Sequence, residues 1–191
     1  MPEIFDDSDM KIVGAPAKKT EDTDFQGMLA ESSRQHFNGN VAKAKMLGAN
    51  IVSAFSYRAA PEELITLIKD SGVTPTDDIL QQVRFLSVFS AEVSLMQYLP
   101  SRLLAEIAKS EMYDVLMKFS PSFYDALARS GAFSFYYMTL VNGAVTPENV
   151  GRQFAVLCGK AGDPVFAALG RRLHEMNVLV FRKAIQGFVF A

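Results

Sequence analysis

The strongest helical pattern in the chain covers residues 79–98, where hydrophobic residues dominate and the only charged side chains are Arg84 and Glu92. At about 100° per residue, the hydrophobic positions occupy more than half of the helix circumference. They are Ile79, Val83, Phe85, Leu86, Phe89, Val93 and Met96. A helix with so wide a hydrophobic surface is normally covered by other helices on several sides. We therefore predict a central, largely buried helix, with Gln81, Arg84 and Glu92 on one hydrated strip.

The C-terminal segment, residues 163–188, is the second organising element. Its hydrophobic residues recur every three or four positions: Phe166, Leu169, Leu173, Met176, Val180, Ala184 and Phe188. Arg171, Glu175 and Arg182 fall on the opposite side, so the pattern predicts an amphipathic helix with one face in the core.

On the central helix, three small side chains border the hydrophobic sector and would let a neighbouring helix come close: Ser87, Ser90 and Ser94.

Turn and capping residues divide the remaining chain into shorter helices. The expected segments are residues 24–37, 41–57, 61–72, 101–118, 120–131, 132–142 and 146–162. Residues 101–118 are read as two short helices or as one bent helix. Thr74 is expected to cap the central helix ahead of Pro75, with Asp77 reaching back to the cap. Residues 132–142 have a strand-like composition, but no partner strand is visible, so a helix is favoured.

These elements predict an all-α fold, a single compact bundle of about seven to nine helices. The helical domain is expected to span residues 24–191. Residues 1–23 are rich in Asp, Lys, Thr and Ala and contain two prolines, a composition typical of a mobile polar tail.

Composition narrows the class of protein. The chain has 191 residues, of which 49% are hydrophobic, and a net charge of −2. This length and composition fit one globular domain, and the charge provides no general attraction to nucleic acid or to an anionic membrane. A helix–turn–helix over residues 41–68 is disfavoured further, because Glu62 and Glu63 would repel phosphate. We therefore expect neither nucleic acid nor a membrane as a partner.

Cysteine usage and the N-terminal residues bear on the compartment. The single cysteine, Cys158, excludes an intrachain disulfide, which is typical of a reducing compartment. The acidic residues Asp6, Asp7 and Asp9 stand where a secretory signal would be hydrophobic. The longest charge-free hydrophobic run, residues 131–145, contains two glycines and is too short to span a bilayer. We therefore expect a soluble, cytoplasmic protein.

The residue spacings that mark catalytic or metal sites are missing. The chain has no phosphate-binding Gly-rich loop and no GxSxG motif, and one cysteine excludes Cys-rich zinc sites. His36 and His174 lack the glutamate three residues upstream that di-metal helical bundles use. We therefore predict no catalytic residue, no metal and no cofactor, and we expect that the chain is not an enzyme.

Three side chains on hydrophobic segments need separate interpretation. His174 borders the hydrophobic stripe of the last helix and is read as a boundary histidine with a satisfied hydrogen bond; a ligand or proton-relay role is the alternative. Cys158 lies in a hydrophobic run and is read as a small buried hydrophobe rather than a nucleophile. A dry Glu92 would be a candidate functional carboxylate, but its place beside Gln81 and Arg84 predicts hydration.

Aromatic residues are dense between residues 113 and 137: Tyr113, Phe119, Phe123, Tyr124, Phe133, Phe135, Tyr136 and Tyr137. Nine methionines are spread through the chain. The simpler interpretation is a core filled by large side chains, and the alternative is an adaptable ligand pocket. The hydroxyl groups of buried tyrosines need partners or water. For such a pocket, the predicted ligand-binding residues are Arg129, Tyr136, Tyr137 and Tyr113.

Three functions remain open. The first is a non-enzymatic module that binds a protein partner or a second copy of the chain, which the hydrophobic residues 188–191 and the wide face of the last helix suggest. The second is a small-molecule sensor with an apolar pocket lined by Tyr, Phe and Met. The third is an enzyme whose site assembles from scattered residues. The missing catalytic spacings favour the first.

Overall fold

The computed structural model describes residues 18–54, 62–141 and 145–191, and within these ranges all regular structure is helical. The helices are α1 (Lys18–Phe37), α2 (Asn40–Ala54), α3 (Glu62–Asp70), α4 (Asp77–Tyr98), α5 (Arg102–Phe119), α6 (Pro121–Arg129), α7 (Ala132–Val141), α8 (Pro147–Leu157) and α9 (Pro164–Gln186). The predicted all-α class is confirmed, and so is the helix expected at residues 132–142.

Some helix boundaries differ from the prediction. Helix α1 begins at Lys18, inside the segment predicted to be a polar tail, while residues 1–17 lie outside the described residues. The predicted role of Pro61 as a first helical residue also lies outside them. Residues 102–119 form one continuous helix, because no Gly or Pro interrupts the segment. Helix α8 ends at Leu157 instead of residue 162, and Gly159 follows with a φ of 69°, a left-handed conformation that ends helices.

The start of α4 corrects one capping prediction. The N-cap is Thr76 and not Thr74: the Thr76 hydroxyl accepts a hydrogen bond from the Ile79 N–H at 3.4 Å. The Thr76 N–H donates to the Thr74 carbonyl at 3.0 Å, so a turn precedes the helix and moves its start past Pro75. Asp77 and Asp78 then occupy the first turn, where the positive end of the helix dipole favours them.

Helix α4 is the centre of the core. It packs against α5, α7, α8 and α9, and its Phe85 and Phe89 side chains are buried. Val88 and Leu95, which the helical wheel places among the polar strip, are also fully buried. Val93 is only partly buried. The predicted enclosure of the central helix is therefore confirmed, and it extends further around the helix than the hydrophobic pattern indicates.

Two glycines allow neighbouring helices to come into backbone contact. A Cβ atom added to Gly48 on α2 would lie 2.2 Å from the carbonyl oxygen of Ala108 on α5. A Cβ added to Gly151 on α8 would lie 2.3 Å from the carbonyl oxygen of Ala167 on α9. Both helix pairs therefore depend on glycine at the crossing point.

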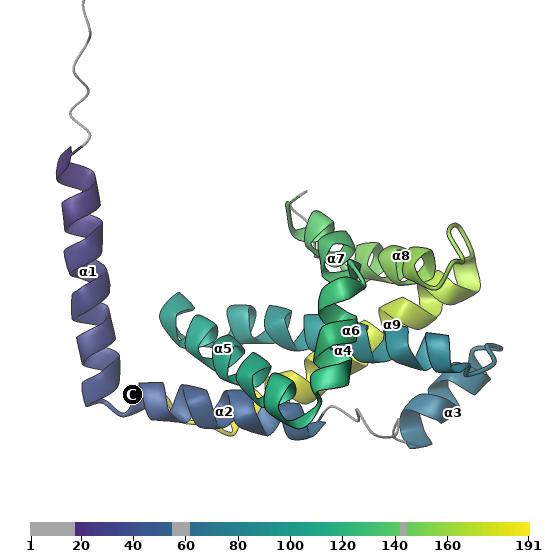
Figure 1. Cartoon of the computed structure of the whole chain (residues 1–191), viewed down its shortest axis with the longest axis horizontal. Helices are drawn as coiled ribbons and strands as arrows, with labels where there is room; N and C mark the ends of the chain where they lie inside the picture. The colour runs from purple at the N-terminus through teal and green to yellow at the C-terminus, as the bar shows by residue number, and fades with distance from the viewer. Residues whose placement is uncertain (1–17, 55–61, 142–144) are drawn as a thin grey trace, which may run out of the picture.

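Helix α1 is set apart from the other helices. Figure 1 shows α1 standing away from the group formed by α2–α9, with the C-terminus near the turn between α1 and α2. Among the described helices, α1 makes its main contacts with α2 alone. We call helices α2–α9 the body of the protein.

Candidate functional site

The candidate site is centred on Glu92, which is buried in the body. Its side chain is only 3% exposed, in the middle of α4. One carboxylate oxygen accepts a hydrogen bond from the Tyr113 hydroxyl of α5 at 2.6 Å. The other accepts a hydrogen bond from the Tyr137 hydroxyl of α7. The predicted hydration of Glu92 is therefore wrong, because α5 and α7 cover this end of the polar strip.

The two phenols are held in their protonated form. Burial raises the pKa of Tyr113 above its ordinary value, and the charge of Glu92 and the hydrogen bond to it raise it further. Burial and the hydrogen bond to Glu92 likewise raise the pKa of Tyr137. Both hydroxyls therefore donate to the carboxylate at neutral pH, and hydrogen bonds to a charged acceptor are stronger than neutral ones. In the part of the chain that the structure describes, Glu92 has no ion-pair partner within 4.0 Å.

Aromatic rings surround this buried carboxylate. The ring of Phe133 lies 6.5 Å from that of Tyr113 and 5.9 Å from that of Tyr137, measured between ring centroids. Beside Tyr113, a cavity of about 180 Å³ opens between α5, α6 and α7. Its lining residues are Tyr113, Tyr124, Leu127, Ala128, Gly131, Phe133 and Ser134. We call this space the aromatic cavity.

The four predicted ligand-binding residues fall in different places. Tyr113 lines the aromatic cavity. The Tyr137 hydroxyl donates to the same carboxylate, that of Glu92, as the Tyr113 hydroxyl does. Tyr136 is fully buried and stacks on Phe89, with ring centroids 4.8 Å apart. Arg129 is exposed and lies 3.5 Å from the Asp125 carboxylate, the pairing that its spacing suggests. Neither Tyr136 nor Arg129 lines the cavity.

The sequence did not single out Glu92, Tyr124 or Phe133 as members of the site. One available signal was the spacing of Phe133 and Tyr137, four residues apart and hence on one face of a helix. The other was Glu92 itself, the only carboxylate between residues 79 and 98. Neither signal shows which helix covers that face, so the site could not be assembled from the pattern alone.

A second polar layer joins α4 to α9. Two of the three serines predicted to let a helix approach bond to α9: the Ser90 Oγ lies 2.8 Å from the His174 Nδ1, and the Asn177 amide donates to the Ser87 Oγ at 3.1 Å. The Ser94 hydroxyl donates to the Ser90 carbonyl within α4. The Ser90 hydroxyl donates to the Leu86 carbonyl, so the His174 Nδ1–H is the donor to Ser90 and Nε2 keeps its lone pair. Burial lowers the pKa of His174 to about 4. The predicted hydrogen bond is confirmed, but His174 is buried and not at a boundary.

A larger groove lies on the other side of this layer. It has a volume of about 650 Å³ and runs between α4 and α9, beside residues 145–147. Its lining includes Met96 and Leu179, which are both about half exposed. His174 and Arg182 also line it. The Arg182 guanidinium lies 5.3 Å from the centroid of the Tyr98 ring, so one end of the groove carries an ordered positive charge.

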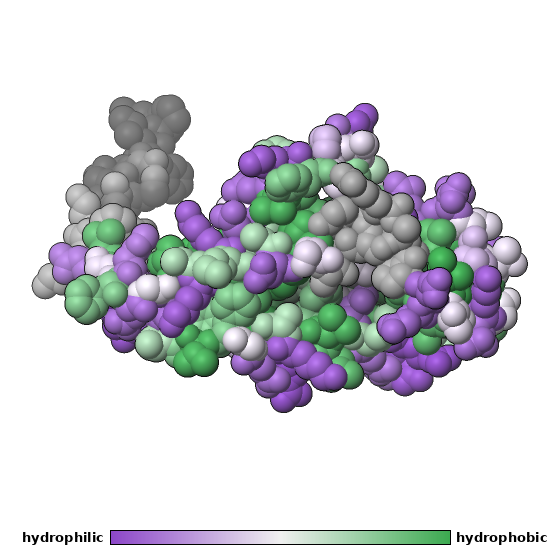
Figure 2. All heavy atoms as spheres, turned by 90° about the horizontal axis from the view of Figure 1, so that it is seen from below, coloured by the Kyte–Doolittle hydropathy of each residue, from purple (hydrophilic) through white to green (hydrophobic). Residues whose placement is uncertain are grey.

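Helix α1 presents a different kind of surface. Met28 is 69% exposed, Leu29 is 52% exposed and Phe37 is 94% exposed. We call the pair of Met28 and Leu29 the α1 surface. On the face shown in Figure 2, hydrophobic residues occur both over the body and at the end of the molecule where α1 lies. Met28 and Leu29 are neighbours near the midpoint of α1, whereas Phe37 lies at its C-terminal end on the opposite side from Met28. An exposed hydrophobic pair on a projecting element is a candidate interaction surface.

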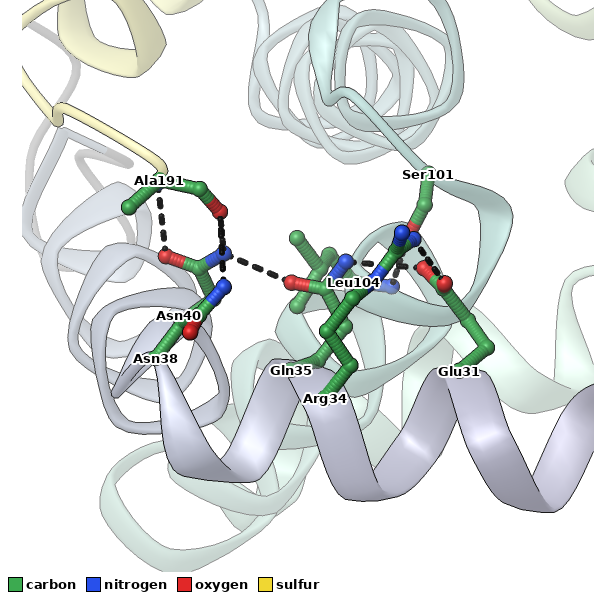
Figure 3. Close-up of polar contacts among 8 residues, drawn as sticks. All are labelled: Glu31, Arg34, Gln35, Asn38, Asn40, Ser101, Leu104 and Ala191. Atoms are coloured by element: carbon green, nitrogen blue, oxygen red, sulfur yellow. Dashed lines mark hydrogen bonds and ion pairs between the residues drawn. The ribbon is translucent and has the colours of Figure 1, made fainter.

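A buried amide network fixes the direction of α1. The Asn40 side-chain amide donates to the Gln35 side-chain Oε1 at 2.6 Å and to the Ala191 backbone oxygen at 2.6 Å, and the Asn40 Oδ1 accepts from the Ala191 N–H at 3.0 Å. Gln35 donates onward to Glu31 at 2.8 Å. Figure 3 shows this chain of bonds running from α1 through Asn40 to the last residue. Because Gln35 and Asn40 are both buried, the network resists reorientation of α1.

Other site chemistries find no support among the described residues. No group of three His, Cys, Asp or Glu side chains is arranged to hold a metal ion in residues 18–54, 62–141 and 145–191. In the same ranges, none of the helices is both long enough and apolar enough to cross a bilayer. Burial raises the pKa of the Cys158 thiol to about 12, which keeps it protonated and unreactive at neutral pH.

Comparisons of this chain with protein-family models, curated proteins and solved structures find no match. Within the described residues, the fold and the sites define an all-helical protein with a body formed by α2–α9, an aromatic cavity and a projecting helix.

Proposed function

We propose that this protein is a non-enzymatic interaction module whose binding element is α1, and that its partner is a second copy of the chain. The observation that carries the proposal is the position of α1. It spans 20 residues, which is about 30 Å at 1.5 Å per residue, and it stands apart from the body with Met28, Leu29 and Phe37 exposed. A helix of this length is marginally stable in water unless it packs against something.

The placement of the hydrophobic residues favours a second copy as the partner. Met28 and Leu29 lie close to the midpoint of α1, which runs from Lys18 to Phe37. Two copies of α1 packed antiparallel about a two-fold axis would place this pair against itself, which closes the assembly as a dimer. Gly27 lies beside the pair with nothing within 4 Å of an added Cβ, so a partner helix has room to approach.

The attachment of α1 supports the same role. The bonds from Asn40 to Gln35 and to Ala191 hold the C-terminal end of α1 against the body, so the rest of the helix projects from a defined point. We place this role in the cytoplasm, a location supported by the single, protonated Cys158.

Sedimentation velocity over a range of protein concentrations tests the proposal. We expect the unmodified chain to sediment as a concentration-dependent dimer. The double variant Met28→Glu/Leu29→Glu should sediment as a monomer, because two carboxylates on each copy would be brought together without partners. A circular dichroism melt checks that the body of the variant remains folded.

A matched control places the same change elsewhere. Met117→Glu/Val165→Glu also replaces two exposed hydrophobic residues, which are 51% and 45% exposed, but on α5 and α9. We expect this variant to dimerise like the unmodified chain. An unmodified chain that stays monomeric at every concentration would refute self-association, and so would a dimer that both double variants weaken equally.

A further inference from the structure

The aromatic cavity has the shape of a cage. Its walls include the rings of Tyr113, Tyr124 and Phe133. The Tyr113 ring meets the Tyr124 ring at 74° and the Phe133 ring at 66°, with centroids 6.2 and 6.5 Å away. The Tyr113 ring therefore stands at a steep angle to both neighbours, and the three rings line the space instead of stacking into a layer. At about 180 Å³, that space is smaller than the roughly 300–1,000 Å³ of pockets for drug-sized ligands, so it suits a group of a few heavy atoms.

The charge around the cavity is negative. The Glu92 carboxylate lies at the hydroxyl end of the Tyr113 ring, and that hydroxyl donates to it. No Lys or Arg is among the described residues that line the cavity, and Arg129 is paired with Asp125. The C-terminus of α6 and the N-terminus of α7 meet beside Gly131, so their opposite dipole ends offset each other. Glu92 therefore places an acidic group next to a lining that contains no basic side chain.

The lining also restricts what kind of cation can enter. A primary ammonium group carries three N–H donors and needs an acceptor for each. Apart from backbone groups and the two phenol hydroxyls, the cavity offers one side-chain acceptor, the Ser134 hydroxyl, beside the apolar Leu127 and Ala128. A quaternary ammonium group carries no N–H and is attracted to the faces of aromatic rings. The lining therefore matches a methylated ammonium better than a lysine-like one.

We propose that the aromatic cavity binds a methylated ammonium group, with Tyr113, Tyr124 and Phe133 as the cage and Glu92 as the charge behind it. The hydrogen bond from Tyr113 to Glu92 makes that ring more electron-rich, which strengthens its attraction for a cation. Two sources supply this chemistry, a free choline-like compound and a methylated lysine side chain. The site is separate from the α1 surface, since its lining residues lie on α5, α6 and α7 and in the turn between α6 and α7.

Calorimetric titration of the full chain tests the proposal. Tetramethylammonium serves as the bare group, and choline is compared with 3,3-dimethylbutan-1-ol, which has the same shape without the charge. We expect the two cations to bind and the neutral alcohol to bind at least tenfold more weakly. Choline and Nε-trimethyl-lysine then separate the two sources by their relative affinities.

Two variants at Tyr124 and one at Glu92 connect binding to the cage. Tyr124 is only partly buried, so Tyr124→Leu should leave the fold intact while weakening choline binding about five- to thirtyfold. Tyr124→Phe keeps a ring and should restore it. Glu92→Gln should weaken choline binding without changing the affinity for the neutral alcohol. Equal binding of choline and the alcohol would overturn the proposal, and so would the absence of choline binding at millimolar concentration while the chain is folded.

Discussion

Helices α1 and α4 have almost the same length, 20 and 22 residues, but opposite surroundings. Helices α5, α7, α8 and α9 pack against α4, and Phe89 at its centre is fully buried. The described side chains of α1 are mostly exposed, and Phe37 at its end is 94% exposed. The comparison shows that α4 is held by tertiary packing, whereas α1 relies on its own backbone hydrogen bonds and one polar junction. An exposed helix of this kind is better suited to association than to core formation.

The largest expected difference is between two phenylalanines. Phe89→Ala empties a fully buried site on α4 and should lower the free energy of unfolding by about 3–5 kcal/mol. Phe37→Ala removes an exposed ring from α1 and should change it by about 0.5 kcal/mol or less. Urea unfolding in dilute solution measures both, and similar losses would contradict the division between α1 and the body.

Two glutamates extend the comparison to charge. Glu92→Leu leaves the Tyr113 and Tyr137 hydroxyls without their acceptor. We expect a loss of about 3 kcal/mol, since each stranded buried donor costs about 1–3 kcal/mol. Glu31→Leu breaks a pair with the exposed Arg34 and one hydrogen bond from Gln35, for which we expect about 1 kcal/mol or less. The same unfolding experiment checks this pair, and an unaffected Glu92→Leu variant would show that the buried bonds are not formed in solution.

Two glycines should respond to alanine with opposite signs. At Gly48 the added Cβ would lie 2.2 Å from the Ala108 carbonyl oxygen, so Gly48→Ala should destabilise by about 1–3 kcal/mol. At Gly27 the added Cβ meets nothing within 4 Å, so Gly27→Ala should stabilise the helical state of α1 by about 0.5–1 kcal/mol. Melting curves followed at 222 nm measure both effects. A stabilising Gly48→Ala would mean that α2 and α5 are further apart than described.

The pH dependence of the free energy of unfolding can be traced by replacing one histidine in each region. Burial lowers the pKa of His174 from 6.5 to about 4, so the unfolded chain binds a proton in this range that the folded chain does not. The stability contribution is therefore complete well above pH 6.5 and is lost as the pH falls toward 4, amounting to a loss of about 2 kcal/mol by pH 5. His174→Gln should remove this part of the pH dependence. His36→Gln, on the exposed end of α1, is the matched control, and equal pH profiles for the two variants would exclude His174 as the cause.

How much could be predicted from the sequence differs between the fold and the site. The enclosure of α4 was predictable, because hydrophobic residues that cover most of a helix require neighbours on several sides. The all-α class followed from capping residues and helical spacing, although Thr76 replaced Thr74 as the cap of α4 because a turn precedes the helix. Capping and spacing rules identify the helices, but they leave the first residue of each helix uncertain by one or two positions.

The candidate site depended on contacts between elements that no local rule provides. Glu92 was expected to be hydrated because Gln81 and Arg84 share its side of the wheel, and these two side chains are indeed partly exposed. Helices α5 and α7 cover only the Glu92 end of that strip. Arg129 was grouped with the tyrosines by proximity in sequence, yet it points to solvent on α6. The helical spacing assigns each residue to a face of its helix. Whether that face is buried depends on how helices distant in sequence pack against it.

Hydrogen exchange at two protein concentrations tests the central claim, that α1 is the binding element and α4 is the packed centre of the body. In dilute solution we expect the amides of α1 to exchange rapidly and those of α4 to be protected. At high concentration α1 should become protected while α4 is unchanged, and the Met28→Glu/Leu29→Glu variant should lose this response. Exchange of α1 that is the same at both concentrations, or exchange of α4 as rapid as that of α1, would contradict the account.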